Sequence, residues 1–161
     1  MEGVRVTKKE KMPWAVKQQC LWIVRDYERM RREYRKMRRD ILDAGGGHYT
    51  TYIENGEERR AFMPSTHNAS RTTEDRQMQL EGLEQTVMVK QLRAVEHSLA
   101  KVGKDMPEML QDALREAILL NCQNGRKYPF ERLYVVGISR ADFYRARNGF
   151  FENIAVELGM I

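Results

Sequence analysis

The sequence has few of the residues that end helices, and it lacks any long apolar run. Its 161 residues include only 4 prolines and 11 glycines, and a proline inside a helix costs about 3 kcal/mol. No stretch approaches the roughly 18 apolar residues of a membrane-spanning helix, and the first residues contain no apolar signal segment. Cys20 and Cys122 are isolated, as in proteins of a reducing compartment. We therefore expect a mostly helical, cytoplasmic protein of one domain, or one domain with an extension, and no membrane segment.

The sequence also lacks the residue groupings that enzymes and metal sites require. The three histidines, His48, His67 and His97, are scattered, and neither a His-Glu-x-x-His nor a Cys-x-x-Cys arrangement is present. The glycines of residues 45–47 are not followed by the Lys and Ser or Thr of a phosphate-binding loop. We therefore predict no catalytic residues, no metal and no cofactor, in a protein that is not an enzyme.

Positive charge is concentrated in two segments that flank an acidic one. The net charge is +5 and the isoelectric point is about 9.3. Residues 17–39 contain nine basic and three acidic residues, and residues 126–147 contain six basic and two acidic residues. Residues 72–124, between them, contain six basic and nine acidic residues. This distribution indicates a polyanionic partner contacted at two places.

An amphipathic helix is expected over residues 13–43, within an N-terminal region of residues 1–43. Pro13 suits a first helical turn, and neither proline nor glycine follows before Gly45. Apolar residues alternate in steps of four and three, which is the spacing of a coiled-coil seam. The seam consists of Ile23, Tyr27, Met30, Tyr34, Met37 and Ile41. Three roles are open to this helix: pairing with a second copy in a homodimer, packing on the rest of the chain, and binding DNA phosphates.

Residues 44–72 are expected to connect this helix to the rest of the chain. Asn55-Gly56 lies between two segments of mixed polarity, which predicts a small β-hairpin over residues 49–63. Residues 64–73 are rich in Ser, Thr and Asn and are expected to form a flexible linker.

Residues 73–161 are expected to form a helical domain. A second long helix should begin with Thr72 or Thr73 as its N-cap and end at Gly103. Its apolar face comprises Leu80, Leu83, Val87, Leu92, Val95, Leu99 and Val102. A third helix should follow Pro107 and end at Asn124-Gly125. The core residues expected from this third helix are Leu110, Ala113, Leu114, Ala117 and Ile118.

Residues 129–158 have the pattern of a helix-turn-helix. A short helix is expected over residues 129–136, followed by Gly137 in a turn that needs a positive φ. Ser139 is expected to cap a second helix that continues to about residue 158, with Asp142 in a capping arrangement three residues later. The inner face is expected to contain Leu133, Ile138, Phe143, Ala146, Phe150, Ile154 and Leu158.

The outward face of this second helix carries side chains suited to DNA. Arg and Asn make bidentate hydrogen bonds with guanine and adenine in the major groove, whereas contacts to phosphates position the duplex without reading its sequence. The residues expected to contact double-stranded DNA are Ser139, Arg140, Ala141, Tyr144, Arg145, Arg147, Asn148, Arg126, Lys127 and Arg132. The residues expected to make an auxiliary contact to DNA or a partner are Arg31, Arg32, Arg35, Arg38 and Arg39. The simpler alternative is a helical hairpin that completes a bundle and exposes its arginines only to solvent.

Four segments resemble phage late-gene transcriptional activators of the RinA/ArpU-like group. Residues 138–147, ISRADFYRAR, resemble the C-terminal motif of that group, and residues 150–159, FFENIAVELG, match its ending. Residues 22–29 look like its N-terminal helix, and residues 94–99 resemble the start of its domain similar to sigma-factor region 4. The resemblance implies a prophage-encoded regulator that binds promoter DNA and contacts RNA polymerase in a bacterial host, in association with the nucleoid. It does not extend to residues 48–70.

These patterns predict an all-α helical bundle that ends in a helix-turn-helix and acts as a sequence-specific DNA-binding transcription regulator. One alternative is a phage DNA-packaging recognition subunit of the small-terminase kind, which also combines a helix-turn-helix with self-association. Such subunits usually place the DNA-reading unit before the oligomerising helices, and the order is reversed here. The other alternative is a non-catalytic coiled-coil interaction protein whose basic faces are only solvated.

Overall fold

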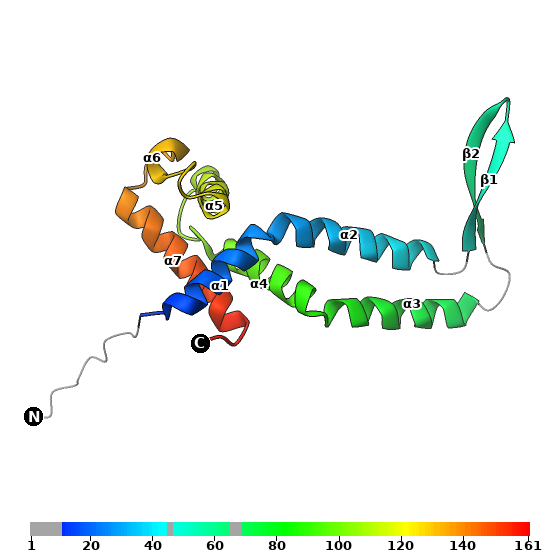
Figure 1. Ribbon diagram of the computed structural model, residues 1–161, viewed down its shortest axis with the longest axis horizontal. Helices are drawn as coiled ribbons and strands as arrows, with labels where there is room; N and C mark the ends of the chain where they lie inside the picture. Colours follow the sequence, from blue (N-terminus) through cyan, green and yellow to red (C-terminus); the bar gives the residue numbers. More distant parts are fainter. Residues whose placement is uncertain (1–10, 45–46, 65–68) are drawn as a thin grey trace, which may run out of the picture. The chain divides into compact units, whose positions relative to one another are not determined.

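The computed structural model describes residues 11–44, 47–64 and 69–161. In this part the chain is mostly helical, as expected, with seven helices and one antiparallel pair of strands (Figure 1). It divides into two compact units, Met1–Tyr27 with Arg93–Ile161, and Glu28–Leu92. These units do not follow the boundaries expected at residues 43 and 73. No helix in the described part is long and apolar enough to cross a membrane.

The helix expected over residues 13–43 is two helices, so that prediction is wrong. Pro13 precedes α1 (Trp14–Arg25), and α2 (Tyr27–Ala44) begins after a single intervening residue. The backbone N–H of that residue, Asp26, is shared between the carbonyls of Trp22 at 3.1 Å and Ile23 at 3.2 Å. Sharing of one N–H in this way is common where a helix ends. As a result, α1 belongs to the first unit and α2 to the second.

In the first unit, α1 packs against α5 (Glu108–Gln123) and α7 (Arg140–Glu157). The thiol of Cys20 donates to the carbonyl of Phe151 at 3.5 Å, and Nε of Arg25 donates to the carbonyl of Cys122 at 2.9 Å. The fully buried side chains of this unit are mostly apolar. They include Cys20, Val24, Val95, Leu114, Ile118, Phe143, Phe150, Phe151 and Ile154. Burial of this apolar set is the main force that holds α1 on the C-terminal helices.

The long helix expected from residue 73 to Gly103 is also two helices. These are α3 (Ala69–Glu84), which begins earlier than expected, and α4 (Val87–Lys101). Between them, the hydroxyl of Thr86 donates to the carbonyl of Leu83 at 2.7 Å and accepts from the N–H of Val89 at 3.4 Å. Threonine at an N-cap satisfies a helix N–H in this way. Because the helix restarts here, Val87 is 71% exposed and not part of the core.

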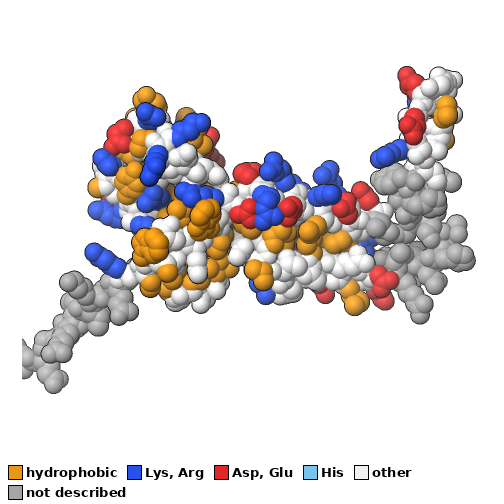
Figure 2. Space-filling model, viewed as in Figure 1, with side chains coloured by type: hydrophobic (Ala, Val, Ile, Leu, Met, Phe, Trp, Pro, Cys, Tyr) orange, Lys and Arg blue, Asp and Glu red, His pale blue; other side chains and the backbone are white. Residues whose placement is uncertain are grey.

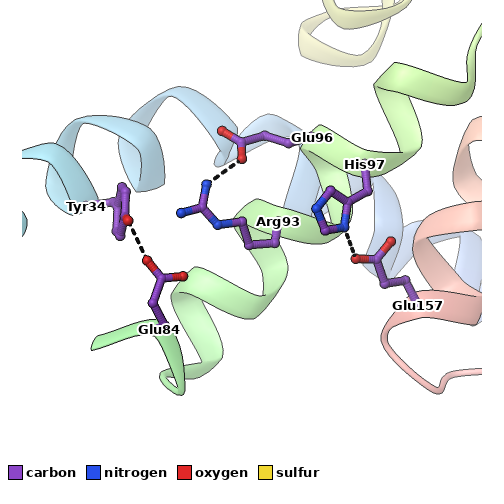
Figure 3. Close-up of polar contacts among 6 residues, drawn as sticks. All are labelled: Tyr34, Glu84, Arg93, Glu96, His97 and Glu157. Atoms are coloured by element: carbon purple, nitrogen blue, oxygen red, sulfur yellow. Dashed lines mark hydrogen bonds and ion pairs between the residues drawn. The ribbon is translucent and has the colours of Figure 1, made fainter. Parts of the chain in front are cut away.

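The seam of the N-terminal segment is buried only in its first half. Met30 is 1% exposed, whereas Met37 is 43% exposed. Within the second unit, the hydroxyl of Tyr34 on α2 donates to the carboxylate of Glu84 on α3 (Figure 3). Of the three roles open to the seam, this contact favours packing within the chain at Tyr34.

The expected β-hairpin is present. Strands β1 (Gly47–Glu54) and β2 (Glu57–Pro64) pair antiparallel, with Tyr52 opposite Arg59. At the turn, Asn55 has φ 54° and Gly56 has φ 81°, the pair of left-handed conformations that a two-residue type I′ turn requires. Of the linker expected over residues 64–73, residues 69–73 belong to α3, and residues 65–68 lie outside the described part.

Candidate functional site

The residues expected at the site lie in the loop after α5, on α6 (Phe130–Leu133), and on α7 and its cap, and α5, α6 and α7 contact one another. The rings of Phe130 and Phe143 are 5.3 Å apart and join α6 to α7. The expected helix over residues 129–136 is wrong in length, because Tyr134 has φ 51° and leaves the helix. Gly137 has φ 86°, as expected. Residues 134–139 therefore connect α6 to α7 and form a longer link than the turn of about 3–4 residues typical of a helix-turn-helix.

The N-terminus of α7 is capped as the sequence predicts. The Ser139 hydroxyl oxygen accepts from the Asp142 N–H at 3.1 Å, and the hydroxyl donates to the Asp142 carboxylate at 2.7 Å. The same carboxylate accepts from Nη1 of Arg145 at 2.7 Å. The cap therefore both begins the helix and orients one of the arginines expected to read bases.

One side of α7 is buried, in agreement with the expected inner face. Phe143, Phe150 and Ile154 are fully buried, and Ala146 is half-buried. The other expected inner residues are also half-buried: Leu133, Ile138 and Leu158. The apolar residues of α7 therefore determine which side of the helix faces the core of the unit.

The opposite side of α7 is open to solvent. Ala141, Arg145 and Asn148 are one helical turn apart and exposed, and the Arg145 side chain is 78% exposed. Ser139 is exposed as well. This strip presents both hydrogen-bond donors and acceptors, without an apolar residue larger than alanine.

A second strip lies between the exposed and buried sides, and we call Arg140, Tyr144 and Arg147 the cationic stripe. The guanidinium carbons of Arg140 and Arg147 are 5.8 and 4.9 Å from the centre of the Tyr144 ring. Arg140 is also ion-paired with Glu131 of α6 at 2.9 Å. In Figure 2, Lys and Arg side chains outnumber Asp and Glu on the visible face of the α5–α7 part. An aromatic ring between two guanidinium groups is stabilised by cation–π attraction.

Arg147 is less exposed than the sequence suggested. Its Nη1 donates to the side-chain oxygen of Asn121 at 2.7 Å, while the Asn121 amide donates to the carbonyl of Tyr128 at 2.9 Å. Asn121 is 2% exposed and was missed by sequence reasoning, although a polar residue on the buried face of α5 between Ile118 and Cys122 is a usable signal. Arg147 thus holds α7 on α5 in addition to contributing charge.

Of the remaining basic residues expected at the site, Arg126 and Lys127 lie in the loop between α5 and α6, and Arg132 lies on α6. The backbone N–H groups of Arg126 and Lys127 donate to the side chain of Asn124 at 3.2 and 3.1 Å, and both side chains are exposed. Arg132 instead lies on the α5 side of α6. It lines an open groove of about 600 Å³ with Leu120 and other apolar residues.

The auxiliary arginines belong to the second unit. Arg32, Arg35, Arg38 and Arg39 are exposed on α2. The side chain of Arg31 is 42% exposed and lies 3.9 Å from Glu28. An exposed ion pair of this kind contributes only about 0–1 kcal/mol, so it holds Arg31 weakly.

Both cysteines are buried, and His97 is paired with a carboxylate. Burial raises the pKa of Cys122 to about 12 and that of Cys20 to about 11. His97 of α4 pairs with Glu157 of α7 through its Nδ1 at 2.6 Å, and Arg93 pairs with Glu96 at 2.8 Å (Figure 3). Across the described residues, no cluster of His, Cys, Asp and Glu is arranged to hold a metal ion.

Comparisons with protein-family models, with curated proteins and with solved structures found no match to this chain.

Proposed function

We propose that this protein is a sequence-specific DNA-binding transcription regulator that inserts α7 into the major groove. The observation that carries the proposal is the arrangement of α7. Its apolar side is buried at Phe143 and Phe150, while Arg145 and Asn148 are exposed one turn apart on the opposite side. A recognition helix needs this combination, because it must be held rigidly by one face and read base edges with the other.

The chemistry of the exposed strip supports base contacts. Arginine pairs with the O6 and N7 atoms of guanine, and asparagine pairs with the N6 and N7 atoms of adenine. Asp142 holds the Arg145 guanidinium at 2.7 Å, which lowers the entropy that this side chain loses when it binds a base.

In this proposal α6 and α7 act as a helix-turn-helix whose first helix is a single turn. Because six residues separate α6 from α7, α7 is supported mainly by α1, and α5 holds it through Asn121 and Arg147. The arginines of α2 are then a second, sequence-independent contact to DNA or to a partner such as RNA polymerase. The resemblance to phage late-gene activators of the RinA/ArpU-like group supports a promoter as the target and activation as the outcome.

The experiment is retention of genomic fragments by the purified protein, followed by sequencing of the retained DNA. Enrichment of one site upstream of an operon is expected. Equal retention of all fragments would contradict sequence-specific binding, and failure to retain any duplex at low salt would support the coiled-coil interaction protein instead. Light scattering gives a separate readout, since assembly into a large ring would favour a DNA-packaging subunit.

A further inference from the structure

The helices α2 and α3 of the second unit run antiparallel and lie side by side (Figure 1). The hydroxyl of Tyr34 on α2 donates to the carboxylate of Glu84 on α3, so these two positions lie at about the same level along the pair. From this contact the chain runs forward along α2 and returns along α3. Residues equally far from the contact on the two helices are therefore level with each other.

Beyond this contact α2 has an exposed basic face, which consists of Arg35, Arg38 and Leu42. Spacings of three and four residues place these side chains on one side of the helix. All three are exposed, and Leu42 is 40% exposed although it is apolar. The first turns of α2 contain two ion pairs between their own side chains, whereas Arg35 and Arg38 form none with any residue that the structure describes.

The neighbouring helix α3 has an exposed acidic face, which consists of Glu74, Met78 and Glu81. These side chains follow one another at spacings of four and three residues, and Met78 is 69% exposed. Glu81 accepts a hydrogen bond from Gln77 at 3.1 Å, but neither glutamate is in an ion pair with another described residue. The basic and acidic faces therefore carry opposite charges, and each includes one exposed apolar side chain.

The basic and acidic faces lie on the same side of the helix pair. Successive residues of an α-helix are about 100° apart around its axis. Counted along the chain, the basic face lies roughly a quarter of a turn beyond Tyr34, and the acidic face lies roughly a quarter of a turn beyond Glu84. Because the two helices run in opposite directions, these equal rotations bring both faces to one side.

The two faces also lie at matching levels along the helices. Arg38 is four residues after Tyr34, which makes it level with position 80, next to Glu81. Leu42 is level with position 76, two residues from Met78. Each residue of an α-helix rises about 1.5 Å, so both offsets are shorter than one helical turn. A two-fold axis parallel to the helices therefore brings arginine beside glutamate, and leucine beside methionine, between two copies.

We propose that this side of the second unit binds a second copy of the chain, with the basic face of each copy on the acidic face of the other. The contact is isologous, so it closes at a dimer. Opposite charges favour this arrangement over α2 on α2, in which arginines oppose arginines, and burial of Leu42 and Met78 removes apolar surface from water. Arg31 and Arg32 lie outside the contact, because their level is beyond the end of α3 at Glu84. The inference does not depend on DNA binding by α7.

The test reverses one charge on either face of the full chain and measures its mass by sedimentation velocity at low salt. The wild type should be a dimer that dissociates as salt rises. Arg38→Glu and Glu81→Arg should each raise the dimer dissociation constant by at least about tenfold, because like charges then meet at both contacts. Lys36→Glu makes the same charge change as Arg38→Glu on an exposed residue of another side of α2, and it should leave the dimer intact.

An equal mixture of the Arg38→Glu and Glu81→Arg proteins distinguishes a contact between chains from a change within one chain. In a mixed dimer, positions 38 and 81 again carry opposite charges at both contacts, so the affinity should return to near the wild-type value. Because both side chains are exposed, circular dichroism should show wild-type helix content for each variant. The dimer contact is refuted by a wild-type chain that stays monomeric at its highest soluble concentration, or by an assembly larger than a dimer. It is also refuted by a mixture that remains monomeric, or by equal effects of Arg38→Glu and Lys36→Glu.

Discussion

Asn121 of α5 accepts a hydrogen bond of 2.7 Å from Nη1 of Arg147 on α7, and its own amide donates to the carbonyl of Tyr128 at 2.9 Å. One buried side chain thereby joins three segments: α5, the loop before α6, and α7. The same bond orients the guanidinium that ends the cationic stripe. Stability of the unit and geometry of the proposed DNA-binding surface therefore depend on a single amide.

The first prediction concerns this amide. Asn121→Ala should lower the free energy of unfolding by about 1–3 kcal/mol, because it leaves the Tyr128 carbonyl and the Arg147 guanidinium without their partner. Gln123→Ala is the matched control, since its amide makes only a long, exposed bond of 3.5 Å to the carbonyl of Arg25. That variant should stay within about 0.5 kcal/mol of wild type. Equal effects of the two changes in urea unfolding would contradict the role of Asn121.

The second prediction concerns the cap of α7. Ser139→Ala removes the acceptor of the Asp142 N–H and should cost about 1 kcal/mol, as is usual for loss of an N-cap. Ser139→Thr keeps the hydroxyl and should be close to wild type. Thermal unfolding followed by circular dichroism measures both. An unchanged melting temperature for Ser139→Ala would show that the cap observed at this residue contributes nothing.

Local signals predicted the elements whose ends depend on a few neighbouring residues. Asn55-Gly56 predicted the hairpin turn, Gly137 predicted a positive φ, and Ser139 with Asp142 predicted the cap, and the structure contains all three. The buried side of α7 followed from apolar spacing alone. The turn, the positive φ and the cap are each decided within about four residues, and the buried side of α7 by a repeated spacing within one helix, so sequence reasoning reaches them.

Features that depend on distant residues were missed or wrong. The break at Asp26 leaves no local sign, since neither proline nor glycine is nearby, and α1 is separated from α2 by its packing on α5 and α7. Thr86 is a weak signal of the break before α4, because threonine is common at N-caps but also occurs inside helices. Its role as a cap follows only from the hydrogen bond that the Val89 N–H donates to it. The link between Asn121 and Arg147 spans 26 positions, and no spacing rule connects them. Sequence reasoning therefore placed Arg147 among the exposed DNA contacts and missed its bond to Asn121.

The third prediction concerns alkaline pH. Burial raises the pKa of Cys122 from its ordinary value of 9.0 to about 12, so the folded chain holds this proton more tightly than the unfolded chain does. Its contribution to stability is complete below about pH 9 and is lost as the pH rises toward 12. The loss proceeds at up to about 1.4 kcal/mol per pH unit for the thiol.

Comparison with Cys122→Ala isolates this contribution from tyrosines and lysines, which also titrate in this range. The variant should be less stable than wild type at pH 7, because it loses buried volume. Its free energy of unfolding should then fall less steeply between pH 9 and 11 in urea titrations. Parallel pH curves for the two proteins would show that Cys122 is not protected from ionisation in the folded state.

The last prediction separates base reading from phosphate binding. Arg145→Ala should reduce the preference for the enriched site over a scrambled duplex by about 1–3 kcal/mol, the value of one guanine contact. Replacing Arg31 and Arg32 together with alanine should weaken binding to both duplexes equally, because contacts to phosphates carry no sequence information. All three side chains are at least partly exposed, so neither change should unfold the protein. The measurement is fluorescence anisotropy with both duplexes at one salt concentration. If Arg145→Ala keeps full discrimination and the Arg31 and Arg32 variant loses it, α2 reads the sequence and the roles of the two helices are reversed.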